Sequence, residues 1–182
     1  MVDVVEVDLA EAGLDVFVCD TDDVLTVDGY SPAGGVWSGL GLVDAVNGLV
    51  DIAQIPLGSS VLSYTIGTGS CMHTDSRAIH VLSNPTASIV TNEANDLACE
   101  GDSVIWIATG LGGNVANPLD YQWEWSGVAT QDAENLSQAW WIAIAPETMG
   151  GMASVVITDT LGCQGVISQS IDIVALPMLS VP

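Results

Sequence analysis

The sequence predicts an all-β protein made of two tandem antiparallel β-sandwiches, and three observations lead to this prediction. First, the stretch from Cys71 to Pro85 recurs as Cys163 to Pro177, with fourteen positions from cysteine to proline in both. Second, short apolar segments follow one another at the 8–12-residue spacing that is typical of sandwich strands, separated by Gly, Asp and Pro. Third, no window longer than about ten residues has the apolar spacing and caps of a helix.

Two further motifs occur twice, in the same order. Cys19-Asp-Thr-Asp22 corresponds to Cys99-Glu-Gly-Asp102, and Trp37-Ser-Gly39 corresponds to Trp125-Ser-Gly127. The series cysteine, Trp-Ser-Gly, cysteine, strand and proline therefore repeats with a period of roughly 80 to 92 residues. A repeat of this length predicts two sandwich domains in one chain.

The repeat also predicts the domain boundaries. We expect one domain at 1–83 and a second at 84–175, because half of the residues (49%) are apolar and each domain can bury a core. The junction Ser83-Asn84-Pro85 is short and favours extended backbone, so we expect a semi-rigid joint. Residues 176–182 are expected to be a linker or the first strand of a following repeat.

Strands are expected where apolar and polar residues alternate between turn residues. In the first domain these segments are 2–7, 14–19, 24–27, the segment that carries Trp37, 61–66 and 77–82. Two Gly-marked segments, 40–50 and 51–56, are assigned no strand. In the second domain the segments are 87–90, 96–99, 103–109, 121–125, 139–145, 154–158 and 170–174.

The four cysteines predict one disulfide in each domain, Cys19–Cys71 and Cys99–Cys163. Four cysteines allow three pairings, and this one is favoured because it joins equivalent residues of the two repeats. A zinc site is the alternative, but the sequence has no Cys-x-x-Cys motif and only two histidines. Each bridge would stabilise its domain by roughly 4 kcal/mol in the chain-entropy model. Disulfides persist in oxidising compartments, which predicts an extracellular or cell-surface location.

The charge balance is extreme, with 23 acidic residues, a single basic residue (Arg77) and a net charge of −22. Such a surface repels phosphate backbones and anionic lipids, which argues against nucleic-acid and membrane-surface partners. No apolar run reaches the 18 or so residues of a membrane helix, and none has the flanks of a secretion signal, so we expect no membrane insertion. If the protein is exported, we expect its signal to lie outside this chain.

Acidic residues after the first cysteine of each repeat have two interpretations. Asp20, Asp22, Glu100 and Asp102 could bind Ca²⁺, which takes six to eight oxygen ligands. The spacing is not that of an EF-hand, however, and Asp is an ordinary turn residue. The overall acidity is also explained by solubility in salty water, where ions screen the repulsion between carboxylates.

The motifs carry a resemblance to a known class of repeats. Pro-Ala-Gly-Gly-x-Trp-Ser-Gly-x-Gly (32–41), followed by Tyr-x-x-Gly-x-Gly-x-Cys (64–71), resembles the Ig-like repeats of very large surface adhesins from Bacteroidetes-type bacteria. Cys-Glu-Gly-Asp-Ser-Val (99–104) with Asp-x-x-Gly-Cys (159–163) resembles the PKD-like repeats that alternate with them. The resemblance implies a stalk of tandem sandwiches linked to adhesion and gliding. The near absence of basic residues departs from those repeats, which usually carry more Thr and Lys.

No group of residues composes an active site, and we expect a protein that is not an enzyme. His73 and His80 have no partnered nucleophile in the sequence, and there is no phosphate-binding Gly loop with a lysine. Paired acids for glycoside chemistry could still meet in space. The Trp-Ser-Gly tryptophan of each repeat is expected to pack on its disulfide, as in immunoglobulin domains.

Two stretches are candidates for an interface. Adjacent residues of a strand point to opposite faces, so one of Trp140 and Trp141 must leave its own core and could pack on a neighbouring domain, a partner or a sugar. The apolar tail formed by Leu176, Met178, Leu179 and Val181 would expose a β edge unless something covers it.

Three functions compete. The first is a structural and adhesive spacer whose partners are neighbouring repeats. The second is a filament subunit that donates a strand to another copy of the chain. The third is a module that binds surface polysaccharide through an exposed tryptophan.

Overall fold

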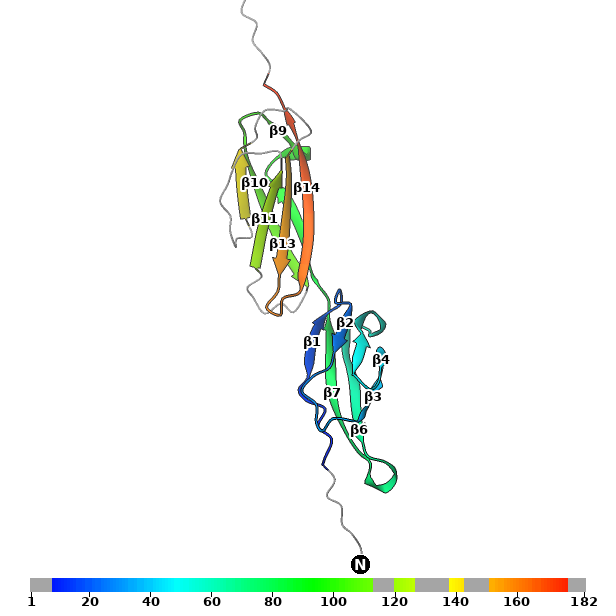
Figure 1. Ribbon diagram of the computed structural model, residues 1–182. Coiled ribbons are helices and arrows are strands. Elements are labelled where there is room, and N and C mark those ends of the chain that lie inside the picture. Colours follow the sequence, from blue (N-terminus) through cyan, green and yellow to red (C-terminus); the bar gives the residue numbers. More distant parts are fainter. Residues whose placement is uncertain (1–7, 113–119, 127–137, 143–150, 177–182) are drawn as a thin grey trace, which may run out of the picture. The chain divides into compact units, whose positions relative to one another are not determined.

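The computed structural model describes residues 8–112, 120–126, 138–142 and 151–176 of the 182-residue chain (Figure 1). The chain divides into two compact units, Met1–Ser83 and Asn84–Pro182. In the described part of both units the regular structure is strands, with three short 3₁₀ turns and no α-helix. No helix among these residues is long and apolar enough to cross a bilayer.

Unit 1 contains two sheets that face each other across one core. The larger has the strand order β1-β7-β6-β3 and the smaller β2-β5-β4. The strands are β1 (Val16–Cys19), β2 (Val24–Thr26), β3 (Val36–Gly39), β4 (Leu42–Asp44), β5 (Leu49–Asp51), β6 (Gly58–Ile66) and β7 (His73–Leu82). The 3₁₀ turn η1 (Ile52–Gln54) follows β5, and η2 (Gly69–Cys71) lies between β6 and β7.

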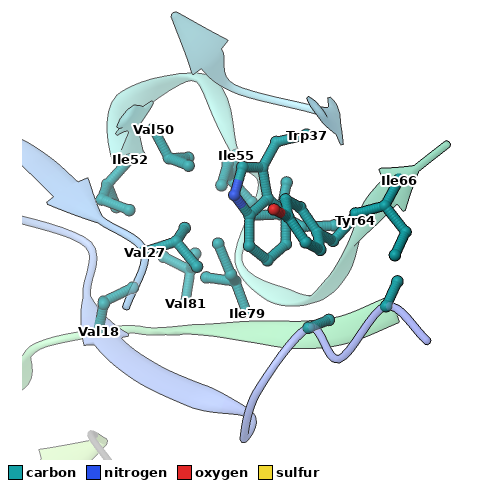
Figure 2. Close-up of a cluster of buried hydrophobic side chains, with 13 residues drawn as sticks. Val18, Val27, Trp37, Val50, Ile52, Ile55, Tyr64, Ile66, Ile79 and Val81 are labelled. Atoms are coloured by element: carbon teal, nitrogen blue, oxygen red, sulfur yellow. The ribbon is translucent and has the colours of Figure 1, made fainter. Parts of the chain in front are cut away.

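The core of unit 1 is built by the alternating faces of these strands (Figure 2). Trp37 from β3 and Tyr64 from β6 are fully buried, with ring centroids 4.9 Å apart, and Tyr30 packs edge-on against Trp37 at 5.4 Å. Val50 of the smaller sheet is also fully buried and belongs to the same cluster, so the two sheets share one interior.

Trp37 does not pack on a disulfide, contrary to the prediction. The core cluster around it contains no cysteine among the described residues. The Trp37 ring packs against the rings of Tyr30 and Tyr64 instead. The side chain of Trp125, its counterpart in the second repeat, lies outside the part of the molecule described here.

Unit 2 also contains two sheets, with the orders β11-β13-β14-β9 and β12-β10-β8. Its strands are β8 (Pro85–Thr91), β9 (Leu97–Cys99), β10 (Ser103–Gly112), β11 (Asp120–Ser126), β12 (Gln138–Ile142), β13 (Gly151–Thr158) and β14 (Gln164–Val174). The 3₁₀ turn η3 (Ala94–Asp96) precedes β9. Trp106 on β10 is fully buried and packs in a cluster with Ala98, Ala153 and Ile171 of the facing sheet.

Each unit contains one parallel strand pair, which corrects the prediction of purely antiparallel sheets. β1 runs parallel to β7, with Cys19 opposite Leu82. β9 runs parallel to β14, with Cys99 opposite Val174. Parallel neighbours need a long crossover, and the remaining strands of each unit provide it. Apolar and polar residues alternate in the same way in parallel and antiparallel strands, so the sequence did not reveal the direction of these two strands.

Several strand boundaries also differ from the prediction. β7 begins at His73 and β14 at Gln164, because the alternating burial of each strand continues through polar residues that the apolar runs had left out. β4 and β5 lie within the segments that were assigned no strand. The predicted strand at 2–7 lies outside the described residues.

Candidate functional site at the cysteine turns

The first cysteine of each repeat begins a tight turn that its own aspartate holds. The Asp22 carboxylate accepts a hydrogen bond from the Cys19 backbone N–H at 2.9 Å, and the Asp22 N–H donates to the Cys19 carbonyl at 3.1 Å. Asp102 makes the same two bonds with Cys99, at 2.8 and 3.0 Å. The Cys-x-x-Asp spacing therefore encodes a turn in which the side chain satisfies a backbone donor.

The same turn is attached to the end of the last strand of its unit. The Asp20 N–H donates to the Leu82 carbonyl at 2.9 Å, and the Glu100 N–H donates to the Val174 carbonyl at 2.9 Å. The two turns thus occupy equivalent places in the two units. Leu82 directly precedes Ser83, the last residue of unit 1.

The second cysteine of each repeat lies at the other end of that last strand. Cys71 ends the 3₁₀ turn η2, just before β7 begins at His73. Cys163 lies between β13 and β14, where the Asp159 carboxylate accepts bonds from the Leu161 N–H at 2.9 Å and the Cys163 N–H at 3.0 Å. This accounts for the Asp-x-x-Gly-Cys motif as a hairpin turn.

The predicted pairings Cys19–Cys71 and Cys99–Cys163 are wrong. Cys19 and Cys163 are disulfide-bonded, whereas Cys71 and Cys99 are free and exposed. Strand direction gives the reason. β7 has ten residues and β14 has eleven, so the two cysteines of one unit are separated by a strand roughly 30 Å long. A disulfide requires Cα atoms within about 7 Å.

The acidic turns do not assemble into a metal centre within the described residues. No group of three or more His, Cys, Asp or Glu residues gathers there as a bound ion would require. Asp22 and Asp102 use carboxylate oxygens to hold their turns. Calcium binding by Asp20, Asp22, Glu100 and Asp102 stays a prediction.

The interface candidates are only partly described. β12 places Trp140 opposite Ile105 and Trp141 opposite Val104 on β10. Leu176 is exposed, after the end of β14. Met178, Leu179 and Val181 lie outside the described residues, so the strand-donating tail stays a prediction.

Tyr64 has a role that the sequence did not reveal. Its hydroxyl donates to the Pro32 carbonyl at 2.5 Å and accepts from the Gly35 N–H at 2.8 Å. A Cβ at Gly35 would lie 2.5 Å from the Tyr64 ring. The Pro-Ala-Gly-Gly motif thus forms a loop fitted around one buried tyrosine.

Arg77, the single basic residue, is buried and structural. Its guanidinium donates to the backbone carbonyls of Asp28 at 2.7 Å and Ala12 at 3.2 Å. Burial lowers the pKa of Arg77, while the charges of Asp28 and Asp15 oppose that change. Arg77 is the only Lys or Arg in the sequence.

Arg77 belongs to a row of side chains on β7 that fastens the N-terminal segment. His73 Nδ1 accepts from the Ala10 N–H at 2.9 Å, and the Asp75 carboxylate accepts from the Ala12 N–H at 2.7 Å. Alternate residues of a strand share one face, so His73, Asp75 and Arg77 reach the segment together. The Ala12 bond is the main reason that the pKa of Asp75 is lowered.

The arrangement of the strands is similar to that in solved structures of tandem Ig domains. The N-terminal eight Ig domains of Down Syndrome Cell Adhesion Molecule (DSCAM) match 92% of this chain with a TM-score of 0.50 and 12% identity. The fold is immunoglobulin-like. Extracellular domains 3–5 of Drosophila OTK match 92% of the chain at 12% identity with a TM-score of 0.47.

This chain spans a limited part of those proteins, 24% of the DSCAM structure and 61% of the OTK structure. At such low identity the likeness concerns the fold alone. The sequence matches no protein-family model. No curated protein matches it significantly.

Proposed function

We propose that the chain is a structural or adhesive repeat module of an extracellular protein, and that it acts as a spacer in a longer array of such units. The observation that carries the proposal is the exact recurrence of one device in both units. In each, a Cys-x-x-Asp turn is fastened to the end of the last strand, and a second cysteine lies at the start of that strand.

The surface chemistry supports a spacer. Arg77 is the only Lys or Arg in the chain and is buried, so the charged side chains at the surface are acidic apart from the histidines. Like charges keep copies of such a module apart and hydrated, and ions in the surrounding medium screen the repulsion. A surface without exposed cations has little with which to bind phosphate, sulfate or carboxylate groups of a ligand.

The resemblance of the motifs to repeats of large bacterial surface adhesins supports the same role. In that setting the module would hold an adhesive tip away from the cell surface. The disulfide-bonded state of Cys19 and Cys163 favours an oxidising, extracellular compartment.

Force spectroscopy tests the spacer role. The full chain, held by its two termini, is expected to resist extension as folded units and to refold after relaxation. A panel of surface polysaccharides, titrated against the intrinsic tryptophan fluorescence, is expected to give no saturable change. A saturable change at micromolar sugar concentration, together with units that unfold at negligible force, would instead support the carbohydrate-binding alternative.

A further inference from the structure

The smaller sheet of unit 2, β12-β10-β8, presents apolar residues on the side that faces away from its core. On the central strand β10, Val104, Trp106 and Ala108 are buried in that core, so the residues between them point outward. The outward aliphatic residues of β8 and β10, each more than a third exposed, are Val90, Ile105, Ile107 and Leu111.

Cross-strand pairing joins these residues into one continuous patch. Ile107 lies opposite Val90 of β8, and Ile105 lies opposite Trp140 of β12. Residues directly opposite each other in an antiparallel pair are on the same side of the sheet. The position of Trp140 therefore belongs to this side. We call the outward side of β12-β10-β8 the apolar face.

None of the outward positions on the described parts of these three strands holds a charged residue, although the chain has 23 acids. Besides the residues already named, these positions hold Thr86, Ser88, Ser103, Thr109, Gln138 and Ile142. The other sheet of the same unit differs, because the exposed Asp120 and Asp172 stand on its outward side. The acids of unit 2 are thus kept off one face.

This distribution of charge selects the partner of the apolar face. An acidic surface of a second copy would bury carboxylates there without a cation, because the single basic residue, Arg77, is itself buried. A basic partner would find no carboxylate on the face to pair with. The same face of a second copy meets neither obstacle. Its aliphatic side chains match, and Ser and Thr hydroxyls both donate and accept, so they pair with their own kind.

We propose that the apolar face docks on the apolar face of a second copy, in a two-fold pairing of sheets about 10 Å apart. From the length of β10 and the spacing of strands, the face covers roughly 500 Å² on each copy. The total of about 1,000 Å² is at the lower end for a specific interface. One pair is therefore weak, and two arrays adhere through many pairs. The inference deepens the adhesive part of the proposed function and rests on it.

The net charge of −22 gives this pairing a characteristic dependence on salt. Carboxylates elsewhere on the two copies repel each other, and ions screen that repulsion. Apolar contact does not depend on such charges. Pairing through the apolar face therefore strengthens as sodium chloride is added, whereas pairing held by opposite charges weakens.

Sedimentation velocity of the full chain over a concentration series tests the docking surface. The exposed thiols of Cys71 and Cys99 are alkylated first, so that no disulfide forms between copies. We expect a monomer–dimer equilibrium that strengthens with sodium chloride. Ile107→Glu places a carboxylate near the middle of the central strand, and we expect it to weaken dimerisation at least about tenfold. Val166→Glu is the matched control, because it makes the same charge change at an exposed position of the other sheet and should dimerise as the wild type does.

A mixture of Ile107→Glu with Ile107→Lys separates a lost contact from a lost fold. Near a two-fold axis the opposite charges meet in the mixed dimer, so we expect the mixture to associate more strongly than either variant alone. Three results would overturn the proposal: a wild-type chain that is monomeric at about 1 mM in high salt, equal weakening by Ile107→Glu and Val166→Glu, or no recovery in the mixture while circular dichroism shows both variants folded. None of them would contradict the spacer role, which the force measurement tests on single chains.

Discussion

At the scale of single residues, two buried polar side chains hold irregular segments of unit 1 in place, although half of the chain is apolar. Tyr64 and Arg77 each bind two backbone groups that are distant in the sequence. Both residues connect a strand of the larger sheet to an irregular segment that has few ladder bonds of its own. Loss of the Tyr64 hydroxyl or of the Arg77 guanidinium would free these segments without emptying the apolar core.

The change Tyr64→Phe removes the hydroxyl and leaves the Gly35 N–H without its partner in a buried site. We expect unit 1 to lose about 1–3 kcal/mol of unfolding free energy, the usual cost of an unsatisfied buried group. Chemical denaturation measures it. Tyr30→Phe is the matched control, because Tyr30 packs in the same ring cluster and its hydroxyl makes no hydrogen bond within the described residues. Equal losses in the two variants would contradict the role of the Tyr64 hydroxyl.

The lowered pKa of Asp75 predicts that the stability of unit 1 depends on pH. Its pKa is lowered, first by the hydrogen bond from the Ala12 N–H and then by that from Ser76. A lowered pKa in the folded state means that this stabilisation is present above the ordinary Asp value of about 3.9 and is lost as the pH falls through the lower, folded value. We expect the melting temperature of Asp75→Asn to fall less steeply than that of the wild type between pH 5 and pH 2. Parallel curves would contradict this.

At the scale of elements, the arrangement of the last strand explains the cysteines. β7 and β14 each pair with an antiparallel neighbour on one side and with a parallel one on the other. That places the two cysteines of each repeat at opposite ends of one strand. Gly165 then allows β14 to approach the first residue of β8.

The change Gly165→Ala tests that approach. A Cβ would lie 1.8 Å from a backbone oxygen of Pro85, so a strand must move. Overpacking of this kind costs typically 1–3 kcal/mol, and we expect unit 2 to lose at least that. Val166→Ala is the control on the same strand, because Val166 is exposed and its loss leaves the approach intact. A loss from Gly165→Ala no greater than that of the control would contradict the close contact.

Much of the element order could be predicted from sequence, because the repeated motifs and the alternation of residues such as Ile79, His80 and Val81 mark strands directly. The direction of β1 could not, since parallel and antiparallel strands alternate identically. The prediction of the disulfide pairing was wrong for the same reason, because it depended on the strand directions. The row of His73, Asp75 and Arg77 was visible as alternate residues, but its targets are backbone atoms some 60 positions away, which no side-chain pattern records.

At the scale of the whole molecule, the net charge of −22 controls how the protein responds to ions. If the acidic turns bind Ca²⁺, calcium chloride should raise the melting temperature more than sodium chloride does at equal ionic strength. Screening acts through ionic strength alone. Superimposable melting curves in the two salts would leave the acidity with no role beyond solubility. The variants Asp20→Asn and Glu100→Gln would show which turn responds to calcium, because the Cys-x-x-Asp bonds are made by Asp22 and Asp102.

The state of the four cysteines tests the account most directly, since it follows from the placing of the two cysteines of each repeat at opposite ends of one strand. The protein is secreted or refolded under oxidising conditions, free thiols are blocked, and the peptides are mapped by mass spectrometry without reduction. We predict that Cys19 and Cys163 are found oxidised and that Cys71 and Cys99 are both found blocked as free thiols. Bridged peptides joining Cys19 to Cys71 and Cys99 to Cys163 would contradict the account.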